Sequence, residues 1–208
     1  MSTPLPPHPT INSRPGPVVL CIMDGVGIGP GGAGDAVALA ATPNLDRWLR
    51  DAPNTALTAS GTSVGLPTDG DMGNSEVGHN AMGAGRVVDQ GAKLVENALA
   101  DGEIWRTQTW RALVDVHTLH LIGLCSDGNV HSHLRHLLAL IDRAAIEGVR
   151  SVKVHVLTDG RDVPARSAEG YIAELERTLG AHRDRGLDYR VASGGGRMQI
   201  TMDRYEAD

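Results

Sequence analysis

In the second half of the chain, strand-like runs alternate with helix-like stretches, and this alternation constrains the fold more than any other feature. Short runs rich in apolar residues predict strands at 118–124, 152–157 and 189–192. Apolar residues at helical spacing predict helices at 134–146 and 166–179. Because alternating strands and helices are typical of a parallel sheet with crossover helices, the sequence predicts an α/β fold.

The first half of the chain is less regular. Residues 1–16 are rich in Pro, Ser and Thr and predict a disordered tail, whereas the continuous apolar run at 17–23 predicts a strand buried on both faces. The residue pattern then predicts, in chain order, a helix at 44–50, strand fragments and turns at 54–70, a helix start at 74–78, and helices at 93–99 and 107–116.

Polar or glycine-rich loops follow each predicted strand of the second half, at 126–128, 159–162 and 193–197. Ligands of open α/β sheets bind outside the carboxyl ends of the strands. Arg161 and Arg197 lie in two of these loops, and guanidinium groups bind phosphate and carboxylate in a bidentate manner. The loops therefore favour a phosphorylated or carboxylated small molecule as the ligand.

The segment at 71–79 (DMGNSEVGH) is the most informative stretch of the first half. Asn74 or Ser75 is an ordinary N-cap candidate, but a serine at a helix start between glycines is also a suitable nucleophile for an incoming phosphate. No His–Asp partner pair is evident in the sequence, which favours activation of Ser75 by a metal ion. Asp24, at the end of the apolar run at 17–23, is either a metal ligand or a turn residue.

Three interpretations of the segment at 131–136 (HSHLRH) stay open at this stage. In the first, the histidines cap and solvate the helix that follows. In the second, they form a zinc site. In the third, His131 binds an anionic substrate. The spacing of the histidines does not choose among them.

Composition excludes several classes of protein. The formal net charge of -6 argues against a broad nucleic-acid or anionic-membrane surface. No apolar stretch is long enough for a membrane span, and the N-terminus lacks the apolar region of a signal peptide. Cys21 and Cys125 both sit in apolar runs and are predicted to be reduced core thiols. Together these features predict a soluble, cytoplasmic protein.

Five ordered motifs resemble the cofactor-independent (2,3-bisphosphoglycerate-independent) phosphoglycerate mutases of the alkaline phosphatase superfamily. In chain order they are VLCIMDGVGIG, DMGNSEVGHNAMGAGR, SDGNVHSHLRH, LTDGRDVPARSA and ASGGGRMQITMDRYEAD. The resemblance covers residues 18–208, and its last motif is more similar to the plant and kinetoplastid branch than to the common bacterial one.

The resemblance implies an architecture of two domains. Residues 17–89 would form the N-terminal part of a phosphatase-like domain that binds two divalent metal ions, Mn²⁺ or similar. Residues 90–208 would form an inserted, incomplete α/β domain that binds the substrate. Asp24 and Ser75 would ligate a metal, with Ser75 also the nucleophile and Asp162 a proton shuttle. The residues that match substrate-binding positions are His131, Arg161, Asp162, Arg197 and Arg204.

The implied reaction interconverts 3-phosphoglycerate and 2-phosphoglycerate through a phosphoserine. The resemblance also implies that the complete protein is a monomer and needs no 2,3-bisphosphoglycerate. Complete members of the family are more than twice as long, so the remaining metal ligands are expected beyond Asp208. We therefore expect a truncated copy or an incomplete gene model with little mutase activity. Two alternatives remain, namely a phosphatase or sulfatase of the same superfamily and a binding module that captures phosphoglycerate without turnover.

Overall fold

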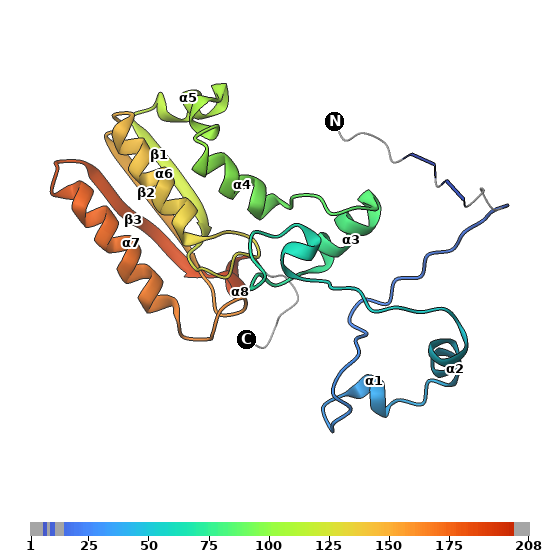
Figure 1. The fold of residues 1–208 in the computed structure, drawn as a ribbon. Helices are drawn as coiled ribbons and strands as arrows, with labels where there is room; N and C mark the ends of the chain where they lie inside the picture. Colours follow the sequence, from blue (N-terminus) through green and yellow to red (C-terminus); the bar gives the residue numbers. More distant parts are fainter. Residues whose placement is uncertain (1–5, 8, 11–14, 202–208) are drawn as a thin grey trace. The chain divides into compact units, whose positions relative to one another are not determined.

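The computed structural model describes all residues except 1–5, 8, 11–14 and 202–208. It divides into two compact units, residues 1–58 and residues 59–208, each of which is described here by itself (Figure 1). The described residues cover only part of the predicted disordered tail at 1–16. Arg204 and the helix start expected near it lie outside the described residues.

The first unit contains two short helices, α1 (Ala36–Leu39) and α2 (Pro43–Asp51). The carboxylate of Asp35 caps α1 by accepting a hydrogen bond from the Ala38 N–H at 3.0 Å. Proline at the first position of α2 suits a helix start, because its missing N–H would have had no partner there. The helix predicted at 44–50 is thus confirmed.

The strand predicted at 17–23 is wrong. The described residues of the first unit contain no strand, Val18 is 84% exposed and Cys21 is exposed as well. A strand buried on both faces needs neighbouring strands and covering layers, and no described segment of this unit supplies either. An apolar run alone therefore does not make a strand, and the prediction that Cys21 is a core thiol fails for the same reason.

The second unit begins with a loop that forms a short 3-10 helix at Gly61–Val64, instead of the strand fragments predicted at 54–70. Within it the Leu66 N–H donates to the Gly61 carbonyl at 3.2 Å, and the Gln90 N–H donates to the Gly65 carbonyl at 2.9 Å. The unit's other elements, in chain order, are α3 (Ser75–Ala84), α4 (Gly91–Ala100), a 3-10 turn (Ile104–Arg106), α5 (Gln108–Val114), β1 (Thr118–Leu124), α6 (Leu134–Ile146), β2 (Ser151–Thr158), α7 (Ala168–Arg183), β3 (Asp188–Gly196) and α8 (Arg197–Ile200).

The three strands form one parallel sheet in the order β1-β2-β3, which confirms the predicted α/β architecture. β3 is longer than predicted, because the glycines expected to form a loop continue its pairing with β2 as far as Gly196, opposite Thr158. Gly195 has a steric reason to be glycine, since a Cβ there would lie 2.3 Å from Ile200 Cδ1. The glycine run lets α8 fold back closely on the end of the sheet.

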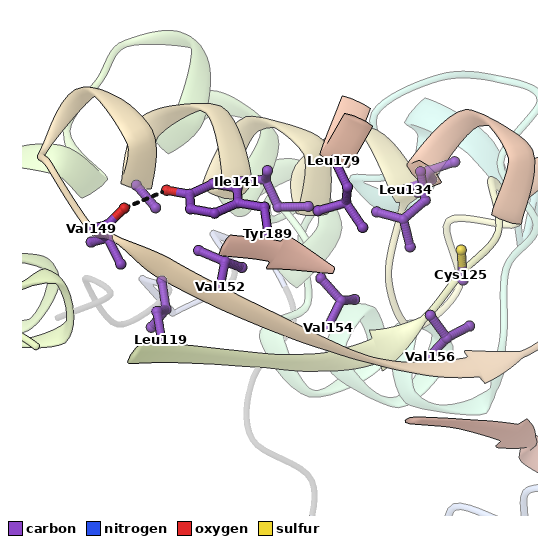
Figure 2. Packing of buried hydrophobic residues seen from close by; sticks show 12 residues of the cluster. Leu119, Cys125, Leu134, Ile141, Val149, Val152, Val154, Val156, Leu179 and Tyr189 are labelled. Atoms are coloured by element: carbon purple, nitrogen blue, oxygen red, sulfur yellow. Dashed lines mark hydrogen bonds between the residues drawn. The ribbon is translucent and has the colours of Figure 1, made fainter. Parts of the chain in front are cut away.

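Helices α6 and α7 cover one face of the sheet, and the core of the unit lies between these two layers (Figures 1 and 2). Val152, Val154 and Val156 alternate along β2 and are buried beneath Ile141 of α6 and Leu179 of α7. Burying a side chain of this size contributes about 1.5–3 kcal/mol to folding. This packed core fixes the strand ends and hence the loops that follow them.

The predicted bounds of α7 need one correction. Arg166 has a φ of +67°, so it lies outside the helix, which begins at Ala168 and continues to Arg183. A left-handed backbone angle cannot be part of a right-handed helix.

In the part of the chain that the structure describes, none of the helices combines the length and the apolar character needed to cross a membrane.

Candidate active site

Polar loops follow β1 and β2, as the sequence predicts, whereas the loop predicted at 193–197 is instead the end of β3 and the start of α8. Ser126 follows β1, Asp159 follows β2, and Arg197 begins α8 directly after β3. Because the strands are parallel, these residues come from the same end of the sheet. The Arg197 side chain contacts the side chains of Asp159 and Asp162, and we call these three residues the Arg197 cluster.

Asp159 is the most enclosed member of the cluster, with a side chain that is 1% exposed. Its Oδ1 accepts hydrogen bonds from the backbone N–H groups of Gly160, Arg161 and Asp162 at 2.8, 3.0 and 3.1 Å. Its Oδ2 accepts the hydroxyl of Ser126 at 2.7 Å. One carboxylate thereby shapes the whole loop after β2 and ties it to the loop after β1.

Burial of the Asp159 carboxyl works against its ionisation. The hydrogen bonds from Ser126 and from the backbone outweigh burial and hold the pKa of Asp159 well below its ordinary value. Asp159 is therefore a carboxylate throughout the physiological pH range.

Arg197 joins the two aspartates. Its Nη1 donates to Asp159 Oδ1 at 3.1 Å and to Asp162 Oδ2 at 2.5 Å. Burial disfavours the charged guanidinium, but the bonds to Asp162 and Asp159 raise the pKa of Arg197 above its ordinary value. Its side chain is 6% exposed, and its Nε is a buried donor that has no hydrogen-bond partner among the described residues. An unpartnered buried N–H of a cation is suited to an anionic ligand.

Asp162 and His131 lie at the more open side of the cluster. His131 Nε2 is 4.0 Å from Asp162 Oδ2, and the two side chains are 54% and 12% exposed. Arg161 is adjacent in the same loop and exposed. The structure thus brings together three residues that the sequence analysis singled out, His131, Asp162 and Arg197, with Arg161 beside them.

Gly128 is required for the close approach of two of these loops. A Cβ at Gly128 would lie 2.9 Å from Asp162 Cβ and 3.3 Å from the Asp162 carbonyl oxygen. The loop after β1 therefore packs directly against the residue proposed as a proton shuttle.

The other histidines of the segment at 131–136 have structural roles. His133 is the N-cap of α6, accepting the Arg135 N–H at 3.1 Å through Nδ1, and His136 Nε2 lies 3.1 Å from Glu96 Oε2. Burial is the main cause of a lowered pKa at His133. Among the described residues, no group of three or more His, Cys, Asp or Glu side chains is placed to hold a metal ion, so the zinc interpretation of this segment is not supported.

Ser75 is the first residue of α3 and its side chain is exposed. Asn74 is the N-cap, since its Oδ1 accepts the Val77 N–H at 2.9 Å. Ser75 Oγ lies 3.3 Å from His79 Nδ1, but this nitrogen is closer to the Ser75 carbonyl oxygen, at 2.6 Å. Because a carbonyl only accepts hydrogen bonds, His79 Nδ1 carries a proton and cannot remove one from the Ser75 hydroxyl.

The start of α3 and the loop after β1 border one cavity of about 410 Å³. Asn74, Glu76, Asn129 and His131 contribute to its lining. Asn129 is buried and donates from Nδ2 to Asp71 Oδ1 at 2.8 Å, which links the segment before Ser75 to the loop that bears His131. The cavity is thus lined by residues adjoining the candidate nucleophile and by a candidate substrate-binding residue.

Sequence reasoning missed Asp159, Ser126 and Asn129 as site residues. An aspartate that directly follows a buried strand and precedes a glycine commonly caps its own loop. Asp159 has this sequence context. Asp24 belongs to the first unit, so its relation to Ser75 stays a prediction, as does the domain boundary between residues 89 and 90.

Comparison with known proteins gives one family. The family described as "BPG-independent PGAM N-terminus" matches residues 93–208, more than half of the chain. A probable 2,3-bisphosphoglycerate-independent phosphoglycerate mutase of Leptospira interrogans is 52% identical over 198 residues, covering 92% of this chain and 36% of the relative. The corresponding mutase of Trypanosoma brucei brucei is 50% identical over 214 residues, covering 100% of this chain and 38% of the relative.

A solved structure gives the same result. The phosphoglycerate mutase of Leishmania mexicana, studied in crystals at low cobalt concentration, is similar with a TM-score of 0.79 and 51% identity. The similarity covers 90% of this chain and 35% of that one. The chain therefore spans little more than a third of the length of these relatives.

Proposed function

Because the chain belongs to the family of BPG-independent phosphoglycerate mutase N-termini, we propose that it carries the nucleophile and part of the substrate site of such an enzyme. The whole enzyme would interconvert 3-phosphoglycerate and 2-phosphoglycerate, as in glycolysis and gluconeogenesis. One observation supports this most strongly, namely the buried Arg197 at the carboxyl ends of three parallel strands, whose Nε finds no partner in the part of the chain that the structure describes.

The proposed substrate site is the Arg197 cluster with its neighbours. Arg197 and Arg161 would bind the anionic groups of the glycerate, His131 would donate a further hydrogen bond, and Arg204 would add another cation. Arginine suits this role because its planar group binds carboxylate or phosphate through two parallel bonds. These contacts would keep the glycerate bound while it reorients between the two transfers.

Ser75 would carry the phosphate between transfers. In the first transfer the Ser75 hydroxyl loses its proton to solvent, the Ser75 Oγ–P bond forms, the bond from phosphorus to the glycerate oxygen breaks, and that oxygen takes a proton from the Asp162 carboxyl group. In the second transfer the other glycerate hydroxyl gives its proton to the Asp162 carboxylate and its oxygen takes the phosphoryl group. The Ser75 Oγ–P bond breaks, and Ser75 Oγ regains a proton from solvent. The N-terminal N–H groups of α3 favour the phosphate's negative charge at Ser75.

A divalent metal ion fits the residues present only in part. Asp24 and Ser75 both offer exposed oxygen atoms, the donors that Mn²⁺ and similar ions accept. They would hold one ion together with ligands from elsewhere in the enzyme, since the described residues contain no fuller ligand group. When bound, the ion would neutralise the transferring phosphoryl group and favour loss of the serine proton.

We further propose that the ion is Mn²⁺, that the complete enzyme is a monomer, and that it is located in the cytoplasm.

A calorimetric titration with 3-phosphoglycerate tests the proposed substrate site. Arg161→Ala removes an exposed arginine of the site, and Arg190→Ala removes an exposed arginine of β3 that pairs with Asp188 instead. We expect Arg161→Ala to weaken binding about tenfold or more and Arg190→Ala to leave it within twofold of the wild type. Equal binding by both variants, or no binding by the wild-type chain, would contradict the proposal.

A further inference from the structure

The Arg197 cluster contains two aspartates around one guanidinium, and their surroundings differ sharply. We propose that Asp159 is a positioning residue that fixes the guanidinium of Arg197 for substrate binding and leaves proton transfer to Asp162. This inference rests on the proposed function and assigns a role to a residue that the sequence analysis did not select.

The hydrogen bonds and the burial of Asp159 disfavour uptake of a substrate proton. Its Oδ1 accepts three backbone N–H groups and Arg197 Nη1, and its Oδ2 accepts the Ser126 hydroxyl. Its side chain is also almost fully buried, at 1% exposed. Protonation of Asp159 would weaken the bonds that shape its own loop, because each of them is stronger to the charged carboxylate.

Asp162 differs in both respects. Its side chain is 12% exposed and its Oδ2 lies 2.5 Å from Arg197 Nη1, with the exposed His131 at 4.0 Å. Neighbouring carboxyl groups in unlike environments commonly divide a permanently charged role from a proton-transferring one. The lowered pKa of Asp159 agrees with the permanently charged role.

Asp159 also determines which part of Arg197 is left for a ligand. Both aspartates contact the same nitrogen, Nη1, so their bonds hold that end of the planar group. Among the described residues, the Nε–H of Arg197 is a buried donor without a partner. With Nη1 held, rotation of the guanidinium is restricted, so the Nε–H keeps a fixed direction in which it would donate to a substrate anion.

Asp159→Asn is the most informative variant, because it keeps an oxygen acceptor for the backbone N–H groups and removes the charge, while an NH2 donor replaces the oxygen that faces Ser126. Asp188→Asn is the matched control, since Asp188 also pairs with an arginine and a lysine but lies outside the site. Ser126→Ala removes one hydrogen bond to Asp159 without changing any charge. Far-UV circular dichroism establishes that each variant is folded.

The first measurement follows the side-chain Nε–H resonance of Arg197 in the ¹⁵N-labelled chain. Asp159→Asn should speed hydrogen exchange of this group about tenfold, Ser126→Ala should speed it by a smaller factor, and Asp188→Asn should leave it unchanged. A purely structural role for Asp159, as a loop cap, would not alter this resonance when the loop is folded. Exchange in folded Asp159→Asn within twofold of wild type would overturn the proposal.

The second measurement is the dissociation constant for 3-phosphoglycerate. Asp159→Asn should raise it about tenfold, the size expected for a disrupted charge-assisted bond, whereas Asp188→Asn should not change it. Unchanged affinity in Asp159→Asn would overturn the proposal.

If wild type binds no 3-phosphoglycerate, the proposed function fails, and the resonance alone decides whether Asp159 positions Arg197. If Asp159→Asn does not fold, Ser126→Ala decides, with unchanged exchange and affinity counting against the proposal.

Discussion

The two cysteines show how the surroundings of a single residue set its chemistry in this protein. Cys125 is 1% exposed at the end of β1, and burial raises the pKa of its thiol to about 11. Cys21 is exposed. Since the thiolate is the reactive form, the same functional group is protected at one position and accessible at the other.

A thiol-modification experiment checks this difference. At pH 8 a maleimide should label Cys21 within minutes and leave Cys125 unmodified in the folded chain, while both should react in denaturant. Mass spectrometry of the digested protein locates the label. Rapid labelling of Cys125 in the folded state would contradict the burial described for the end of β1.

Tyr189 gives a pH-dependent prediction at the same scale. Its hydroxyl donates to the Val149 carbonyl oxygen at 3.0 Å in the core (Figure 2), and burial raises its pKa to about 12. Because the folded state favours the neutral phenol, its stabilising contribution is complete below about pH 10 and is lost as the pH rises towards 12.

Substitution of Tyr189 by phenylalanine tests this assignment. Tyr189→Phe leaves a buried carbonyl without its partner and should cost about 1–3 kcal/mol of unfolding free energy at pH 7. Between pH 10 and 12 the variant should lose less stability than wild type, measured by urea unfolding at each pH. Parallel loss in the two proteins would show that Tyr189 does not cause the alkaline dependence.

At the scale of elements, the link between the segment before α3 and the loop after β1 holds two parts of the site together. Asn129 has a φ of +54° and donates to Asp71 Oδ1. Burial opposes ionisation of Asp71, but hydrogen bonds from Asn129 and Thr68 lower its pKa overall. The Asn129 position thus combines an unusual backbone angle with a buried hydrogen bond.

Two substitutions separate these contributions. Asn129→Gly loses the hydrogen bond but accepts the positive φ, and should cost about 1 kcal/mol of unfolding free energy. Asn129→Ala loses the bond and also strains the backbone, and should cost about 1–2 kcal/mol more. Urea unfolding measures both. If the two variants are equally stable, the backbone at residue 129 does not hold the left-handed angle.

The elements of the second unit could be predicted from sequence because their signals are local. The bounds of β1 and α6 match the prediction, since Leu134, Ile141 and Ala144 form a buried helical stripe that is visible in the residue pattern. The strand expected at 17–23 failed because burial of an apolar run depends on partners elsewhere. The bond between Ser126 and Asp159 could not be predicted, because it forms only when loops 33 residues apart meet.

At the scale of the whole molecule, the chain spans about 36% of the Leptospira relative, and its described residues contain no group of three or more His, Cys, Asp or Glu side chains placed to hold a metal ion. We therefore expect the purified 208-residue chain, supplied with Mn²⁺, to form no 2-phosphoglycerate from 3-phosphoglycerate above the blank. An assay coupled to enolase measures this, with the full-length Trypanosoma brucei relative as the positive control. Mn²⁺-dependent turnover by the chain alone would contradict the expectation.

The net charge of -6 agrees with the proposed substrate site, because that site needs only a few cations at the strand ends, such as Arg161 and Arg197, instead of a broad basic surface. The central claim is that these loops form the substrate site. Amide chemical shifts of the ¹⁵N-labelled chain during titration with 3-phosphoglycerate test it most directly. We predict saturable changes confined to residues 126–131, 159–163 and 195–200. Changes centred elsewhere, or none at saturating ligand, would contradict the account.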